Sequence, residues 1–557
     1  MQEAKRRERR SAGCGVTGVP WDAAAAAALG IDWLVAASAP AGEFGRRRRA
    51  AERAFVPGDE IAVRASIEAV VRVAGGAGAE SLEALRMALA AAPDPNTALA
   101  RAAAGDVLGD VDFFELNRFL DALAGVRAAA AGEAFEGVAL PAGDADLAAV
   151  LAPGRTAQRG FYLDDAFGSD LAAARTLAND RQAAYDSARS ALGARVARAL
   201  GLDHLRDGEF TLLRAGLRGP LPPEVRVLRE APTYLACELA LDEAALAALE
   251  ARDAAAARVA EAEEAVRARL SRIVGESASH LRGACDALGE LDAFVGRARF
   301  AQRYACVVPE IADRRDAFSF DFARYLPLAE SLAASGRAYV PISLRLDGTA
   351  VVTGPNMGGK TAALRTCGFL AACVVLGLPI PASAASVPLF DEIAWVGVAR
   401  GEHEEATSER QLLSAFGAEV IVLRDMLERH PERALVLVDE FARTTTPREG
   451  RALLVALLQV LRARGALALA ATHLNGVARE AGVTHFAIAG LHALPPRSTP
   501  PLDLAAALDL IGGAMDYRLR RNEEDEIGRA DALTLAEVLG LDTDLIRRAR
   551  ADLSIST

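Results

Sequence analysis

The spacing of apolar residues divides the chain into a helical first part and a second part in which strands and helices alternate. Between residues 21 and 130, apolar residues recur every three or four positions, as in Leu82 and Leu85, which predicts helices with one buried face. Two longer segments, 171–200 and 242–301, are also helical in pattern and carry many charges of alternating sign. We therefore expect two long helices that pair as an antiparallel arm.

Residues 210–241, between the two long helices, have a different pattern. They combine β-favouring residues such as Tyr234 with the turn-forming run Gly219–Pro223, which predicts a small hairpin at the tip of the arm. A plain helical bundle with a loop is the alternative. The Gly- and Pro-rich stretch 131–160 predicts a linker, and residues 1–22 predict a flexible lead without the apolar run of a signal peptide.

After Pro309 the pattern changes to short apolar runs bounded by loops. Such runs, when they alternate with helical segments, are typical of a parallel sheet with crossover helices. The predicted strands are 339–346, 350–353, 434–438 and 466–471.

The strand at 350–353 leads directly into a glycine-rich turn and then a helix. Residues 354–361 match the P-loop pattern Gly-x4-Gly-Lys-Thr. Backbone N–H groups of such a loop converge on phosphate oxygens, Lys360 can reach the outer phosphates, and the hydroxyl of Thr361 can bind Mg²⁺. The predicted phosphate-binding residues are Gly354, Pro355, Asn356, Met357, Gly358, Gly359, Lys360 and Thr361.

Two further strand ends supply candidate catalytic groups. The apolar run 434–438 ends in Asp439 and Glu440. Asp439 is expected to hold Mg²⁺ and Glu440 to polarise the attacking water of an ATPase. The run 466–471 is followed by His473, which can sense the γ-phosphate or orient water; a capping histidine at a strand end is the alternative.

Composition limits the classes of protein to which the chain can belong. It has 557 residues, of which 52% are hydrophobic and 25% charged, as in globular proteins of several domains. The net charge of -12 disfavours generic nucleic-acid binding unless a local basic patch provides it. The charge-free stretch 366–390 is broken by prolines, so we expect a buried helix and strand rather than a membrane span.

Lysine and cysteine usage adds two observations. Lys5 and Lys360 are the only lysines among 63 basic residues, which is consistent with a site at Lys360 that needs a compact ammonium. The six cysteines are scattered without a Cys-x-x-Cys pair, so reduced thiols and a cytoplasmic location are expected.

These motifs, in this order, resemble the MutS superfamily of mismatch-repair ATPases. The run Asn356–Lys360 resembles the P-loop of that family, and Ser414–Glu419 its Ser-x-Phe-x-x-Glu segment. Asp439–Thr445 is similar to its Walker B motif and following loop, Ala471–His473 to its switch histidine, and 532–547 to its closing helices.

The resemblance implies a fold, a cofactor set and an assembly. It implies an ABC-like α/β P-loop NTPase domain at the C-terminus, after a mainly α-helical core and a lever arm of long helices. It also implies Mg²⁺-dependent ATP hydrolysis in a homodimer, in which Ser414 faces the nucleotide of the partner. The implied division is a flexible tail 1–22, core 23–160, arm 161–274, core 275–335, and an ATPase domain 336–557 that ends in dimerisation helices.

Two departures from the family pattern bear on function. Only a short tail precedes the core, so the mismatch-reading and connector domains are expected to be missing. The glycines usual after Walker B are replaced in Glu440–Pro447, as in a subfamily that reactivates adenosylcobalamin-dependent lysine 5,6-aminomutase. We therefore expect a protein client such as that aminomutase; the alternative is a DNA-binding ATPase of mismatch repair or recombination.

Overall fold

The chain forms two compact units in the computed structural model. Unit 1 contains residues up to 91, 126–140 and 286 onward, and unit 2 contains 92–125 and 141–285. The residues that the structure describes are 16–131, 138–156, 160–205, 208–217, 219–312, 318–355, 358–397, 415–429, 431–491, 504–522 and 532–555.

A six-stranded sheet is the centre of the C-terminal part of unit 1. Its order is β13-β12-β7-β11-β10-β9, and every neighbouring pair is parallel except β12 with β13. The predicted parallel sheet is therefore present, although β9, β12 and β13 were not predicted. The strands are β7 (Thr349–Thr353), β9 (Glu392–Val396), β10 (Ala434–Asp439), β11 (Leu467–Ala471), β12 (Thr484–Leu491) and β13 (Met515–Arg521).

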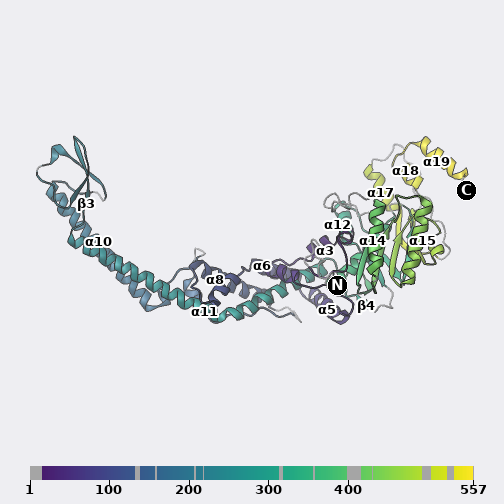
Figure 1. The fold of residues 1–557 in the computed structure, drawn as a ribbon, viewed down its shortest axis with the longest axis horizontal. Coiled ribbons are helices and arrows are strands. Elements are labelled where there is room, and N and C mark those ends of the chain that lie inside the picture. Colours follow the sequence, from purple (N-terminus) through teal and green to yellow (C-terminus); the bar gives the residue numbers. More distant parts are fainter. Residues whose placement is uncertain are drawn as a thin grey trace. The chain divides into compact units, whose positions relative to one another are not determined.

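Helices cover both faces of this sheet, which explains why its central strands β10 and β11 are continuous apolar runs (Figure 1). Leu435 and Leu437 of β10 pack with one helical layer, whereas Val436 and Val438 pack with the other. The helices nearest the sheet are α13 (Lys360–Val375), α14 (Ala415–Arg429), α15 (Pro447–Ala463) and α16 (Val477–Ala481).

Helix α13 and the segment after it account for the charge-free stretch 366–390. Thirteen of the sixteen residues of α13 are buried, and β8 (Ala384–Pro388) follows it. No described helix is both long and apolar enough to cross a bilayer. The stretch is therefore a core helix and a strand, as predicted.

A second sheet of unit 1 corrects one strand assignment. The predicted strand 339–346 is β6 (Ile342–Leu346), which belongs to a four-stranded sheet of order β4-β8-β5-β6 rather than to the parallel sheet. Its partner β5 (Phe318–Ala323) runs antiparallel to it, and β4 is Glu310–Ala312. The sequence did carry a signal of this difference, because β6 buries alternate residues, whereas β10 is buried at nearly every position between two helical layers.

The first described residues and the remaining helices complete unit 1. Val16, Val19 and Trp21 are buried in the main core, so residues 16–21 are not the flexible lead that was expected. The helices are α2 (Ala23–Leu29), α3 (Ile31–Ala37), α4 (Glu43–Ala50), α5 (Glu60–Gly76), α6 (Ala79–Ala91), α12 (Leu326–Ala334), α17 (Leu504–Ala514), α18 (Ala532–Val538) and α19 (Thr543–Ile555).

Unit 2 is built on two long helices that pair along their length (Figure 1). They are α10 (Ser169–Leu200) and α11 (Glu243–Arg303), whose last residues belong to unit 1. Arg175 of α10 donates to Glu263 of α11 at 2.9 Å, and Arg252 lies over the ring of Tyr185. The shorter helices are α7 (Asn96–Ala103), α8 (Asp110–Ala129) and α9 (Ala145–Leu151).

The tip of these helices is a three-stranded antiparallel sheet rather than a hairpin. Its order is β1-β3-β2, with β1 (Phe210–Leu213), β2 (Val225–Glu230) and β3 (Tyr234–Leu239). Phe210 of β1 packs with Leu192 of α10 and Leu235 of β3 in a small core. The bundle alternative is excluded, because the segment between the helices is a sheet.

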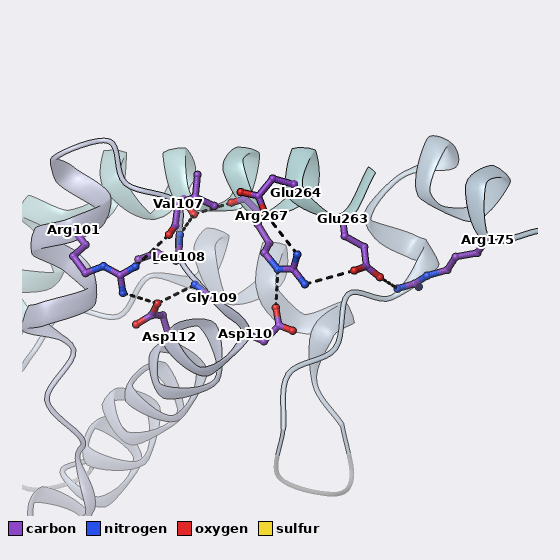
Figure 2. Close-up of polar contacts among 11 residues, drawn as sticks. Arg101, Val107, Leu108, Gly109, Asp110, Asp112, Arg175, Glu263, Glu264 and Arg267 are labelled. Carbon is purple, nitrogen blue, oxygen red and sulfur yellow. Dashed lines mark hydrogen bonds and ion pairs between the residues drawn. The ribbon is translucent and has the colours of Figure 1, made fainter. Parts of the chain in front are cut away.

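A chain of ion pairs joins the helices of unit 2 beside the start of α8. Figure 2 shows Arg267 of α11 between Asp110 and Glu263, with Arg175 on the other side of Glu263. Asp112 accepts a hydrogen bond from Arg101 at 2.8 Å. These contacts fix α7, α8 and α10 against α11.

Candidate nucleotide site

The P-loop leaves β7 at its carboxyl end and enters α13 at Lys360. Gly359 has a φ of 96°, which favours glycine, and a Cβ on Gly354 would lie 2.9 Å from Cβ of Ile488. Both positions therefore need glycine for the chain to make this turn. Asn356 and Met357 lie outside the described residues.

Lys360 is buried, and the loop itself supplies its hydrogen-bond acceptors. Its Nζ donates to the carbonyl oxygens of Gly354, at 2.8 Å, and Pro355, at 3.1 Å. Burial lowers the pKa of Lys360, and the nearby carboxylates of Glu440 and Asp439 oppose this shift. A phosphate would supply the counter-charge that this ammonium lacks in its immediate contacts.

Asp439 meets Thr361 at the start of α13. The hydroxyl of Thr361 lies 3.0 Å from Oδ1 and 3.1 Å from Oδ2 of Asp439. Burial raises the pKa of Asp439, and the Thr361 hydrogen bond opposes this shift. The two side chains suit Mg²⁺, because they place hard oxygen ligands together and leave room for water and phosphate oxygens.

The register of three strands explains this meeting of residues distant in sequence. Val352, Ala471 and Asp439 are neighbours across β7, β11 and β10 at their carboxyl ends. The P-loop, the Asp439 carboxylate and the segment leading to His473 therefore leave the sheet at the same edge, as ligand-binding loops do in open α/β sheets. The side chain of His473 is exposed there.

The loop after Asp439 has an unusual backbone. Glu440 and Ala442 have φ values of 52° and 60°, in the left-handed region that non-glycine residues rarely adopt. Two contacts hold this conformation: the N–H of Glu440 donates to Ala471 O at 3.0 Å, and the N–H of Ala442 donates to the carboxylate of Glu419 at 3.0 Å. Glu419 is buried, and burial raises its pKa.

Ser414, the predicted contact to a partner's nucleotide, lies outside the described residues. The segment that follows it contributes through Glu419, whose role was not predicted. Its only sequence signal was its place in the Ser-x-Phe-x-x-Glu run.

Two further residues near the P-loop were also missed. His485 of β12 is buried, with its Nε2 2.8 Å from the hydroxyl of Thr353. Tyr517 of β13 lies beside the loop, because a Cβ on Gly359 would be 3.3 Å from its ring. Both come from strands that the sequence did not reveal.

Comparison with known proteins agrees with this geometry. Residues 350–493 match the family model of MutS domain V. This match, together with the relatives described next, supports membership of the MutS superfamily. The chain is 32% identical over 277 residues to Endonuclease MutS2 of Carboxydothermus hydrogenoformans, which covers 49% of this chain and 32% of the relative.

Other relatives of the same name match over similar lengths. Endonuclease MutS2 of Gemmatimonas aurantiaca is 33% identical over 271 residues, covering 48% of this chain and 30% of the relative. That of Geobacillus thermodenitrificans is 30% identical over 288 residues, covering 51% and 33%. The matched segment thus spans about a third of these curated relatives. Nothing in the comparisons supports the expected aminomutase-reactivating role.

Proposed function

We propose that this protein is an ATP-hydrolysing conformational switch of the MutS type that acts on DNA. The observation that carries the ATPase part is the meeting of Thr361 and Asp439 at 3.0 Å beside the buried Lys360. An ammonium, a hydroxyl and a carboxylate gathered at a glycine-rich helix start are suited to a nucleotide triphosphate with its metal.

The proposed mechanism assigns each group one task. Lys360 exchanges its two carbonyl acceptors for phosphate oxygens when ATP binds, and Thr361 and Asp439 hold Mg²⁺. The metal, when bound, neutralises part of the phosphate charge. Glu440 accepts a proton from the attacking water, and the exposed His473 orients that water or senses the γ-phosphate.

Two substitutions separate nucleotide binding from hydrolysis. Lys360→Ala removes the ammonium, so ATP binding should be lost. Glu440→Gln keeps the shape of the side chain but not the base, so ATP should bind while turnover falls by about 10²–10⁴-fold. Titration calorimetry and phosphate release measure the two steps, and wild-type turnover in both variants would refute the assignment.

DNA is proposed as the substrate because the relatives are named Endonuclease MutS2, the name of a nucleic-acid-cleaving enzyme, and because unit 2 offers a local basic region. The chain has eight arginines and four acidic residues between positions 189 and 229, in contrast to its net charge of -12. Arg198 and Arg229 are exposed there and form no ion pair with a described residue. Such guanidinium groups are suited to phosphate contacts.

The salt dependence of DNA binding tests whether these arginines contact DNA. Each phosphate contact contributes about one to the slope of log K against log salt, so Arg198→Gln with Arg229→Gln should reduce the slope by about 2. Arg272→Gln is the control, because Arg272 is also exposed in unit 2 but pairs with Glu276 at 2.7 Å. Equal slopes in both variants, or no DNA binding at low salt, would count against DNA as the substrate.

The proposal includes a homodimer in which Ser414 of one chain contacts the nucleotide of the other. It is supported by the superfamily relationship. Glu440→Gln should accumulate dimers in the presence of ATP, because bound ATP is not consumed, and Ser414→Ala should weaken them. Sedimentation velocity with and without ATP measures this, and a monomer under all conditions would exclude it.

A further inference from the structure

Away from the nucleotide site, unit 1 contains a cavity of about 340 Å³ whose lining is rich in arginine. Arg48, Arg49, Arg53 and Arg297 line it, and Glu52 is the one acidic residue among the lining residues. A volume of this size falls in the range of small-molecule sites. Four guanidinium groups around one cavity repel one another unless anions lie among them.

Carboxylates pair with three of these four arginines. Arg297 pairs with Glu52, Arg48 with Glu290 at 3.2 Å, and Arg53 with Asp59 at 2.8 Å. Glu290 and Asp59 do not line the cavity. The lining itself therefore carries an excess of positive charge.

Two of the arginines are held rigidly. Arg49 is buried and donates to the carbonyl oxygen and the hydroxyl of Ser38, at 2.6 and 3.0 Å. The side chain of Arg297 is 13% exposed, and its buried Nε has no hydrogen-bond partner among the described residues.

The lining of the cavity also contains apolar residues. Leu376, the residue that follows α13, is buried, and Phe55 lies beside it through a hydrogen bond from Phe55 N to Val375 O at 2.9 Å. Both line the cavity together with Val16. The lining thus combines guanidinium groups with apolar and aromatic side chains.

We propose that this cavity binds a phosphate-bearing small molecule, with its phosphate among the arginines and its organic part against Phe55 and Leu376. Planar guanidinium groups recognise phosphate through paired hydrogen bonds, which fits a lining that contains four arginines. The site is separate from the P-loop and does not depend on the proposed ATPase activity.

The test uses the full chain with Lys360→Ala, so that the P-loop does not compete for the probes. Pyrophosphate and AMP are titrated by calorimetry at constant ionic strength. The second variant adds Arg48→Gln and Arg53→Gln, whose side chains are 46% and 62% exposed and can be replaced without disturbing the core. The matched control adds Arg46→Gln, because Arg46 is on the same helix and pairs with Glu43 but does not line the cavity.

We expect at least one of the two probes to bind the Lys360→Ala protein. The double arginine variant should then raise its dissociation constant at least tenfold, and the Arg46→Gln control should change it less than twofold. The proposal is overturned if neither probe binds, or if the double variant and the control bind equally. Thermal melts of each variant without ligand establish that all are folded.

Discussion

Glu419 offers the sharpest test of how the Asp439–Ala442 loop is positioned. Its buried carboxylate accepts the N–H of Ala442, two residues beyond the proposed base Glu440. Glu440 and Ala442 both have positive φ values, of 52° and 60°. We predict that Glu419→Ala releases this loop, so that ATP binds normally but is hydrolysed slowly.

The expected loss of turnover follows from two opposing energies, the cost of the left-handed backbone and the stabilisation by the Glu419 hydrogen bond. Left-handed backbone costs about 1–2 kcal/mol per non-glycine residue, so Glu440 and Ala442 together cost about 2–4 kcal/mol. A hydrogen bond to a charged acceptor contributes about 1.5–3 kcal/mol, which offsets much of that cost. If its loss appears entirely in the barrier for hydrolysis, turnover should fall by roughly 10- to 150-fold.

The assay is single-turnover phosphate release together with the dissociation constant for ATP. Glu419→Gln is the conservative control, because its amide oxygen can still accept from Ala442, and it should retain more activity than Glu419→Ala. Ala442→Gly in the Glu419→Ala background should restore part of the activity, because glycine adopts φ of 60° without strain. Wild-type turnover in Glu419→Ala would refute the reasoning.

Two further predictions concern stability. Gly296→Ala should destabilise the protein by about 1–3 kcal/mol, because the new Cβ would lie 2.7 Å from the carbonyl oxygen of Ser38. Gly283→Ala on the same helix is the control, because its Cβ would meet nothing within 4 Å. It should be neutral or stabilising in thermal melts. Burial raises the pKa of Asp439, so the stability that its protonated form contributes at low pH is lost as pH rises through the folded pKa. Asp439→Asn should therefore melt at an equal or higher temperature than wild type at pH 7.5 while losing hydrolysis; a lower melting temperature would contradict the burial argument.

Lys360, Thr361 and Asp439, which the structure brings together, could be selected from the sequence because they lie next to local signals. The P-loop pattern marks Lys360 and Thr361, and a buried parallel strand marks Asp439 by its carboxyl end. Both long helices were also predicted closely, since periodicity over many residues is a strong signal; 171–200 and 242–301 correspond to α10 and α11.

The unpredicted parts depend on contacts between distant segments. His485 contacts Thr353 because β12 pairs with β7, and Tyr517 reaches Gly359 because β13 pairs with β12. Glu419 binds Ala442 only because the backbone turns into the left-handed region there. No local pattern reports strand order or such a turn. The assignment of 339–346 to the wrong sheet has a different cause, because the alternation of buried and exposed residues in β6 was a local signal that the prediction did not use.

The proposed ATPase activity requires that the P-loop and Asp439 hold one nucleotide and its metal jointly. The most direct measurement is the affinity of wild type and Asp439→Asn for ATP, each titrated with Mg²⁺ and with EDTA. We predict that Mg²⁺ strengthens ATP binding in wild type and that this gain is lost in Asp439→Asn, whereas binding in EDTA is similar in both. An equal gain from Mg²⁺ in the two proteins would show that Asp439 does not share the nucleotide's metal, and would contradict the account.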